Sequence, residues 1–201
     1  MWIVKLGGSL IADPALPHWL ELLAQLGGGR VTIVGGGGNF ADEVRRVQAL
    51  WQFNDLAAHN MAVLAMAQIG HLIHAMNPML QMAARKAEIP QVLHKGRAAI
   101  WLPFELQRDE PDGRTNWGAT SDTIALDLAR ELNAERLILV KSCTIDPTHT
   151  LAQLGAAGVV DEGFDERAHG AAFPIDVMDK SELARMRSLL LGDPRHPEAL
   201  A

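Results

Sequence analysis

The chain has little of what marks secreted, membrane or nucleic-acid-binding proteins. Cys143 is its single cysteine, so no internal disulfide can form, and a reducing cytoplasm is the simpler home. No segment reaches the roughly 18 continuous apolar residues of a membrane span, and we see no basic and apolar leader at the N-terminus. The net charge is −6, with only short basic groups at residues 45–46 and 185–187. We therefore expect a cytoplasmic protein with no membrane or nucleic-acid partner.

The remaining composition is that of an ordinary folded domain. Hydrophobic residues make up 48% of the chain and charged residues 21%, so disorder is not indicated. A chain of 201 residues fits one α/β domain with a substantial core. We therefore expect a single domain over residues 1–201.

Two short apolar runs end in glycine turns. WIVKL is followed by GGS at residues 7–9, and VTIV by four glycines at residues 35–38 and then Asn39. Glycine lets backbone N–H groups approach anionic oxygens, and a following helix adds the positive end of its dipole. Lys5 stands where the first run ends, so its ammonium group can reach the same anion. The pattern predicts phosphate binding and phosphoryl chemistry.

Neither turn has the spacing of the common nucleotide motifs. A P-loop places its lysine after the glycines, and the dinucleotide motif reads Gly-x-Gly-x-x-Gly with an acidic residue about 20 positions later. An oxidoreductase with a dinucleotide site is therefore the less favoured alternative.

Strands and helices alternate along the chain. We predict helices over residues 14–27, 39–51, 54–76, 78–87, 120–132 and 180–191, and further strands over residues 97–102, 136–140, 158–160 and 173–177. Asn39 is expected to cap its helix, with Phe40, Val44, Val47 and Leu50 on the buried stripe. Residues 103–118 form a long polar loop, a candidate lid over a substrate. The order predicts an α/β fold, with a mostly parallel sheet covered on both faces.

Ligands of such sheets bind beyond the carboxyl ends of the strands. Lys5, the glycines after Val34, and Lys141 all fall at strand ends. The chain has only five lysines, so two at strand ends favour an anion site there.

Three ordered motifs resemble those of the amino acid kinase superfamily. They are VKLGGS at residues 4–9, VGGGGN at residues 34–39 and TSDTIA at residues 120–125. Within it, residues 40–45 and 58–66 look most like the small kinases of methanofuran and tetrahydromethanopterin pathways, which resemble enzymes that phosphorylate an aminomethylfuran-methyl phosphate to a pyrophosphate. The resemblance implies a three-layer αβα sandwich with an acceptor-side lobe over about residues 1–118 and a nucleotide-side lobe over about residues 119–201.

The resemblance also implies roles for individual residues. Lys5 would neutralise the transferred phosphoryl group, and Asp122 would orient Lys5 and a second lysine, either Lys141 or Lys180. The nucleotide-binding candidates are Gly7, Gly8, Ser9 and Lys180, and the acceptor-binding candidates are Gly36, Gly37, Gly38, Asn39, Arg45, Thr120 and Ser121. ATP with Mg²⁺ would be the phosphoryl donor, a small phosphorylated molecule the acceptor, and a homo-oligomer the assembly.

The chain departs from the superfamily pattern at three places. Gly35 stands where many members have His, which is expected to leave more room for the acceptor. Residues 141–145 replace a Thr-Asp-x-Asp-Gly segment near the adenosine, and the late glycine-rich motif with the second lysine is not recognisable. A catalytically silent nucleotide- or anion-binding protein is therefore the main alternative.

Simpler roles stay open for the same residues. Lys5 can merely cap a strand, Asp122 can be a helix N-cap, and Lys141 can be solvated. Arg45 can lie on an exposed helix end. His71 and His74 share a helix face, but no carboxylate or cysteine completes a metal site with them, so we predict none.

Overall fold

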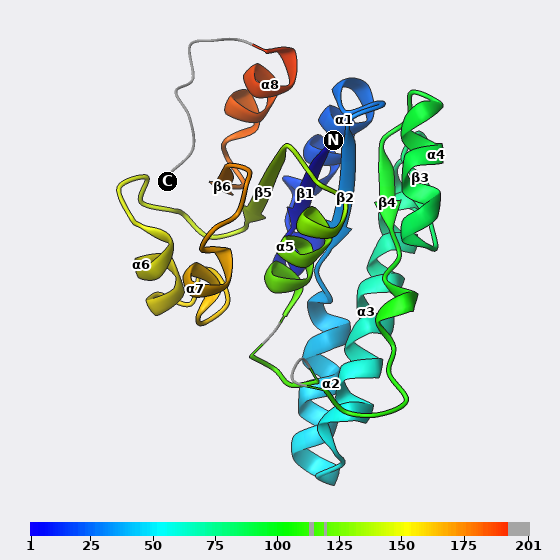
Figure 1. Ribbon diagram of the computed structural model, residues 1–201, viewed down its shortest axis with the longest axis vertical. Helices are drawn as coiled ribbons and strands as arrows, with labels where there is room; N and C mark the ends of the chain where they lie inside the picture. Colours follow the sequence, from blue (N-terminus) through cyan, green and yellow to red (C-terminus); the bar gives the residue numbers. More distant parts are fainter. Residues whose placement is uncertain (113–114, 119, 193–201) are drawn as a thin grey trace.

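A computed structural model of the chain, which describes residues 1–112, 115–118 and 120–192, is built around one six-stranded sheet (Figure 1). Its strands are β1 (Trp2–Leu6), β2 (Val31–Gly35), β3 (Gln81–Ala83), β4 (Ala99–Trp101), β5 (Arg136–Lys141) and β6 (Ile175–Asp179). They lie in the order β3-β4-β2-β1-β5-β6, and each described pair of neighbours is parallel. The predicted α/β class with a parallel sheet is confirmed.

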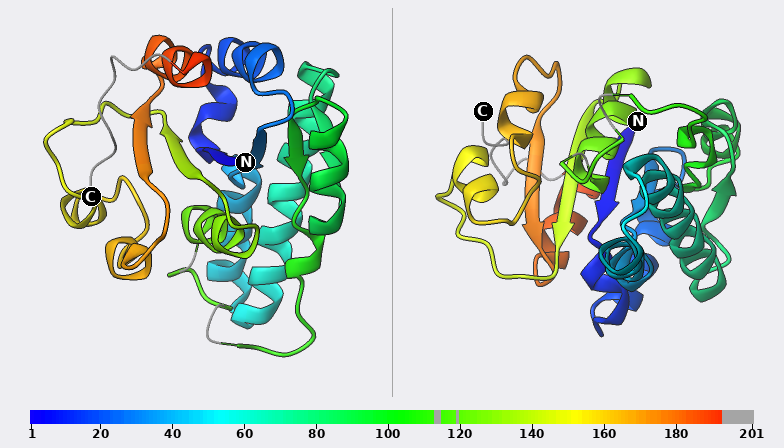
Figure 2. Two further views of the ribbon diagram at one scale, coloured as in Figure 1. Left: turned by 45° about the horizontal axis from the view of Figure 1, so that its top comes forward. Right: turned by 90° about the horizontal axis from the view of Figure 1, so that it is seen from below.

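Helices cover both faces of this sheet (Figure 2). They are α1 (Leu16–Leu26), α2 (Gly38–Trp51), α3 (Asp55–Met76), α4 (Ile89–His94), α5 (Ser121–Glu131), α6 (Leu151–Ala156), α7 (Phe164–Ala168) and α8 (Leu183–Leu191). One core cluster joins the sheet to α4, α5, α6 and α7 and to Met66 of α3, and the other joins it to α1, α8 and the later part of α3. The layers are therefore helix, sheet and helix, as predicted.

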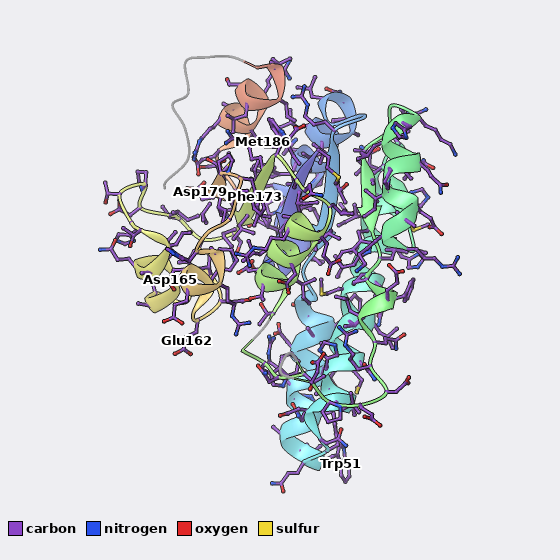
Figure 3. The ribbon with its side chains drawn as sticks, viewed as in Figure 1. Trp51, Glu162, Asp165, Phe173, Asp179 and Met186 are labelled. Carbon is purple, nitrogen blue, oxygen red and sulfur yellow. The ribbon has the colours of Figure 1, made fainter. Side chains whose placement is uncertain are left out.

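Helices α2 and α3 pack against each other and extend past the carboxyl ends of the strands (Figure 1). By length and composition α3 could cross a membrane, with a mean hydropathy of 1.3 in its most apolar window, although polar residues interrupt the run. Within that window 44% is buried, and Ile69 and Ile73 belong to the core. Trp51, which ends α2, is 74% exposed and projects from the far end of the molecule (Figure 3).

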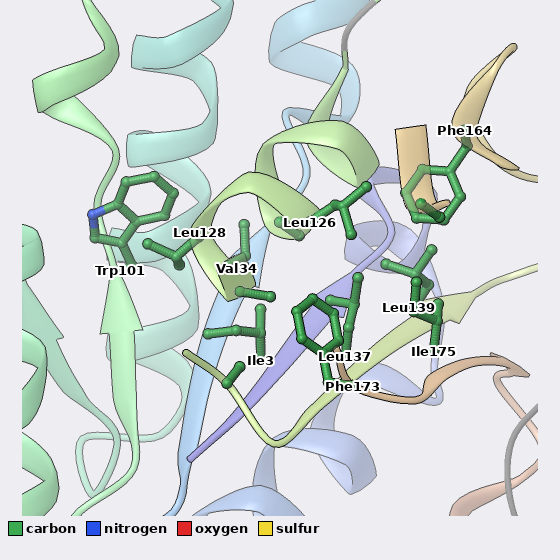
Figure 4. Packing of buried hydrophobic residues seen from close by; sticks show 14 of the residues in the cluster. Ile3, Val34, Trp101, Leu126, Leu128, Leu137, Leu139, Phe164, Phe173 and Ile175 are labelled. Atoms are coloured by element: carbon green, nitrogen blue, oxygen red, sulfur yellow. The ribbon is translucent and has the colours of Figure 1, made fainter. Parts of the chain in front are cut away.

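Successive side chains of each strand point to opposite faces of the sheet, so the core is divided into two clusters. Ile3 and Val4 are adjacent in β1 and fully buried, yet they belong to different clusters on opposite faces. Figure 4 shows the cluster that contains Ile3, with Leu126 of α5 and Phe164 of α7 above the strands. Helix α5 is thus packed directly over the centre of the sheet.

Some predicted elements are wrong. Residues 78–87 contain the edge strand β3 and a 3₁₀ turn at Lys86–Glu88 in place of a helix. The apolar run there is too short for its period to separate a strand from a helix, and pairing with β4 decides it. Residues 158–160 are not a strand, because the N–H groups of Val159 and Val160 bond to the Leu154 carbonyl and close α6.

Other elements begin at a different residue or were missed. Helix α8 begins at Leu183, because Asp179 accepts the N–H of Ser181 and forms a turn that leaves Lys180 outside the helix. Helix α2 is capped at Gly37, so Asn39 lies inside it, and Phe40 and Leu50 are exposed, contrary to the predicted stripe. The short helices α4, α6 and α7 had no predicted counterpart.

Candidate functional site

An open cleft of about 500 Å³ lies at the carboxyl ends of the strands. Its walls come from the turn after β1, the first turn of α2, one side of α3, the start of α5 and residues 158–161. It is lined by these predicted site residues: Lys5, Gly8, Ser9, Gly37, Gly38, Asn39, Arg45, Thr120, Ser121, Asp122 and Lys141. The fold thus brings together residues from four separate parts of the chain.

Two lysines share one carboxylate on the floor of the cleft. Lys5 Nζ lies 2.6 Å from Oδ1 of Asp122, and Lys141 Nζ lies 2.5 Å from Oδ2. Lys5 is in β1, Lys141 ends the neighbouring strand β5, and Asp122 is in the first turn of α5. All three residues are buried, so Lys141 is not solvated. The N-cap of α5 is Thr120, so Asp122 does not have that role.

This group carries one surplus positive charge. Burial raises the pKa of the Asp122 carboxyl, but the charges of Lys5 and Lys141 outweigh it and hold that pKa below its usual value. Burial, helped by the charge of Lys5, lowers the pKa of Lys141 to about 8, against the opposing charges of Asp122 and Asp161. At neutral pH the group therefore presents an excess cation to the cleft, which suits an anionic ligand.

The two glycine turns touch each other. A Cβ on Gly8 would lie 2.5 Å from the backbone nitrogen of Gly38, and Gly38 has a φ of +52°. Gly7 and Gly36 lie outside the cleft lining, where their N–H groups donate to Val140 and Leu6 of the sheet. Glycine is therefore needed for the close approach of the two turns.

Gly35 does not leave the additional space for the acceptor that the sequence predicted. It is buried at the end of β2, and a Cβ there would lie 2.7 Å from Cγ2 of Ile69 in α3. The space beside this position is filled by an isoleucine side chain, so that expectation is wrong.

A cation and an indole ring face each other on the α2 side of the cleft. The Arg45 guanidinium lies 4.3 Å from the ring centroid of Trp117 and 2.8 Å from Oδ1 of Asp42. The Trp117 indole N–H donates to Oε1 of Gln48 at 2.6 Å. Arg45 is thus held at the cleft rather than left free on a helix end. Trp117 was not predicted as a site residue, although an indole in a polar loop is a detectable signal.

Lys180 lies away from the other candidates. Its Nζ is 2.6 Å from Oδ2 of Asp13, its side chain is 43% exposed, and it does not line the cleft. Of the two lysines considered for the second cation, Lys141 is the one beside Lys5.

The carboxylates of the cleft are already occupied by protein donors. Asp122 is bound by the two lysines, and Asp161 accepts bonds from Thr120 and Thr123. The other two carboxylates that line the cleft accept from neighbours on the same side, Asp42 from Arg45 and Asp55 from Gln48. Within residues 1–112, 115–118 and 120–192, no group of three or more His, Cys, Asp and Glu side chains is placed to hold a metal. His74 bonds to the Leu80 carbonyl instead. A divalent ion here would need ligands from a bound substrate.

Known proteins resemble this chain in sequence and in fold. The model of the amino acid kinase family matches residues 1–143. A relative from Methanocaldococcus jannaschii, named [5-(aminomethyl)furan-3-yl]methyl phosphate kinase, is 27% identical over 140 residues. That match spans 69% of this chain and 64% of the relative, so this chain covers a little under two thirds of its length.

Solved structures share the fold at low sequence identity. Uridylate kinase from Archaeoglobus fulgidus has a TM-score of 0.69 at 15% identity, over 95% of both chains. UMP kinase from Bacillus anthracis has a TM-score of 0.68 at 18% identity, over 96% of this chain and 92% of that one. An isopentenyl phosphate kinase has a TM-score of 0.62 at 15% identity, over 99% and 98%.

Proposed function

This chain belongs to the amino acid kinase family, and we propose that it is a small-molecule kinase. It transfers the γ-phosphoryl group of ATP to a small anionic acceptor that itself carries a phosphate. The observation that carries this proposal is the buried pair of lysines on Asp122, open to a cleft at the strand ends. Phosphoryl transfer needs positioning and charge neutralisation far more than covalent help, and this group supplies both.

The lysines act on the charge that moves during transfer. An oxygen of the acceptor forms a bond to the γ-phosphorus while the bond to the ADP oxygen breaks, and ADP leaves with that electron pair. Lys5 and Lys141 neutralise the negative charge on the oxygens of the transferred phosphoryl group. Asp122 holds both ammonium groups in place, one on each of its oxygens. A phosphate acceptor is already anionic, so no general base is needed.

The two substrates meet over the glycine turns. We assign Gly8 and Ser9 to the nucleotide and the N–H groups of Gly37 and Gly38 to the acceptor, because all four line the cleft. Arg45 and Asn39 of α2 and Thr120 and Ser121 at the start of α5 complete the acceptor side. Gly7 and Gly36 support the turns. We also propose an acceptor-side lobe over about residues 1–118 and a nucleotide-side lobe over about residues 119–201. Gly8 and Ser9 of the first lobe would then reach across to the nucleotide, and Thr120 and Ser121 of the second would reach across to the acceptor.

The Methanocaldococcus relative supports a class of acceptor. Its name specifies a phosphorylated aminomethylfuran. We propose an acceptor of that kind, a small heterocyclic methyl phosphate from the biosynthesis of C1 carriers such as methanofuran or tetrahydromethanopterin. The stacked Arg45 and Trp117 offer a cation and an aromatic edge to such a molecule.

We propose that Mg²⁺ arrives with ATP and is held by phosphates and water, since the carboxylates of the cleft are engaged by protein donors.

We also propose that the protein is a cytoplasmic homo-oligomer. Exposed apolar side chains on α2 and α3, namely Leu50, Trp51, Met61 and Leu64, are a surface that a second copy would cover.

The test is an ATP-consumption screen over phosphorylated small molecules, with an aminomethylfuran-methyl phosphate included, alongside calorimetric titrations of ATP, ADP and NAD. Turnover with a phosphorylated acceptor is expected, and the Lys5→Ala variant should lose it while it stays folded. ATP binding without turnover for any acceptor would favour the silent binding protein. Binding of NAD in place of ATP would favour the oxidoreductase.

A further inference from the structure

Helix α5, which carries Asp122, is capped from outside itself. Its N-cap residue, Thr120, makes no capping bond with its own side chain. Asp161, which lies between α6 and α7, accepts the N–H of Thr120 at 3.0 Å and the N–H of Thr123 at 3.1 Å on Oδ2. The Thr123 hydroxyl donates to the same oxygen at 2.9 Å, and the Thr120 hydroxyl donates to Oδ1. One carboxylate thus holds four donors of the first turn.

The position of this turn decides where Asp122 lies. Asp122 has a short side chain, and its two oxygens must reach Lys5 and Lys141 at the same time. A small rotation or slide of the first turn would break one of these contacts. The charge of Asp161 also stabilises the positive end of the helix dipole.

We propose that Asp161 is a positioning residue of the transfer site, which fixes the first turn of α5 so that Asp122 can orient both lysines. The proposal rests on the proposed kinase function and adds a residue to it. Asp161 lines the cleft on the side where Lys141 lies, yet its oxygens are used by Thr120 and Thr123. It therefore acts through α5 rather than on the substrate.

The charge of Asp161 also acts on Lys141. The charged groups that act on this ammonium are Asp122 of α5, Lys5 of β1 and Asp161 itself. Two of them are negative, and they keep Lys141 protonated against the effect of burial and of the charge of Lys5. Loss of the Asp161 charge should lower the pKa of Lys141.

A helix cap that serves only stability would behave differently. It would lower the melting temperature when removed, but it would leave kcat at its wild-type value in the pH range where Lys141 is charged. The comparison therefore uses Asp161→Asn, which keeps the shape and loses the charge, and Asp161→Ala, which loses both. Glu162→Gln is the matched control, because Glu162 is the next residue and is exposed.

The first measurement does not depend on catalysis. The full-length chain is labelled with ¹³C at lysine Cε, its five lysines are assigned with single Lys→Arg variants, and the Lys141 signal is titrated by NMR. Asp161→Asn should shift the Lys141 titration to lower pH, and Glu162→Gln should leave it unchanged. An unchanged Lys141 titration in folded Asp161→Asn would overturn the proposal, even if the protein proved not to be a kinase.

The second measurement is turnover. We expect kcat to fall about tenfold to a hundredfold in Asp161→Ala, with a smaller change in KM for ATP, because a misplaced Asp122 acts in the transition state. Asp161→Asn should recover part of the melting temperature, with the alkaline limb of its pH profile moved to lower pH. Wild-type kcat and an unmoved limb in both variants, with only the melting temperature lowered, would reduce Asp161 to a structural cap. Lack of turnover in the wild type would count against the kinase function alone.

Discussion

Lys141 Nζ lies 2.5 Å from the Asp122 carboxylate, whose other oxygen is occupied by Lys5 at 2.6 Å. This pairing follows from the sheet, because β1 and β5 are parallel neighbours whose carboxyl ends meet at one edge. The late motif that supplies a second lysine in relatives of this family is not recognisable in the chain. Lys141 is in a position to supply that cation from the end of β5.

Replacing each of the two candidate lysines in turn by methionine tests this assignment. Lys141→Met should lose most of its kcat at saturating ATP, on the order of 3 kcal/mol of transition-state stabilisation. Lys180→Met should keep its kcat, because Lys180 is exposed and binds Asp13 outside the cleft. Steady-state kinetics of both variants decide between them. The reverse pattern would assign the role to Lys180.

Turnover should fall as the pH rises through about 8, because Lys141 is needed in its charged form and burial lowers its pKa to about 8. This fall at alkaline pH should be clearest in kcat/KM, which reports the free enzyme. In the enzyme–substrate complex the bound phosphates would favour the protonated form of Lys141 and move the fall to higher pH. A kcat/KM profile that stays flat to pH 10 would contradict the role of Lys141.

Stability should change with pH in the opposite direction. Between about pH 8 and 10.5, Lys141 is deprotonated in the folded chain and still protonated in the unfolded one. The unfolded state then binds more protons, so this group raises the free energy of unfolding with pH, by at most about 1.4 kcal/mol per unit. Denaturant unfolding of wild type and Lys141→Met across this range measures it, since the rise should be smaller in the variant.

Asp122→Asn should damage both activity and stability. The two ammonium groups would lose the carboxylate between them, and breaking a buried charged pair costs roughly 3 kcal/mol or more of unfolding free energy. We expect kcat to fall more than KM for ATP rises, with the alkaline limb of the pH profile at lower pH. Kinetics and denaturant titration of the variant together check this. A loss of stability with normal kcat would show that Asp122 is only structural.

Local patterns in the sequence were sufficient for part of the site. Lys5 and Lys141 each stand at a strand end that short-range periodicity reveals, whereas Asp122 was implied by the resemblance to the superfamily. Asp161 could not be found this way, since it bonds to Thr120, 41 positions away. Trp117 stands out as an indole in a polar loop, but its bond to Gln48, 69 positions away, does not show in the local sequence. The strand β3 was missed for a related reason. Three residues are too few to show the period of a strand, and the pairing with β4 that makes them one cannot be read from the local sequence.

Gly8→Ala should disrupt the site without removing any functional group. The added Cβ would lie 2.5 Å from the backbone nitrogen of Gly38, so the two glycine turns would have to separate. Overpacking of this kind costs about 1 to 3 kcal/mol, and the N–H groups that face the anion would shift with the turns. Gly155→Ala is the matched control: its Cβ would lie 3.6 Å from the nearest backbone oxygen, and in helix α6 alanine is favoured over glycine. We expect Gly8→Ala to lower both the melting temperature and the ATP affinity measured by calorimetry, and Gly155→Ala to change neither for the worse. Normal ATP affinity in folded Gly8→Ala would mean that the turn after β1 does not bind the nucleotide.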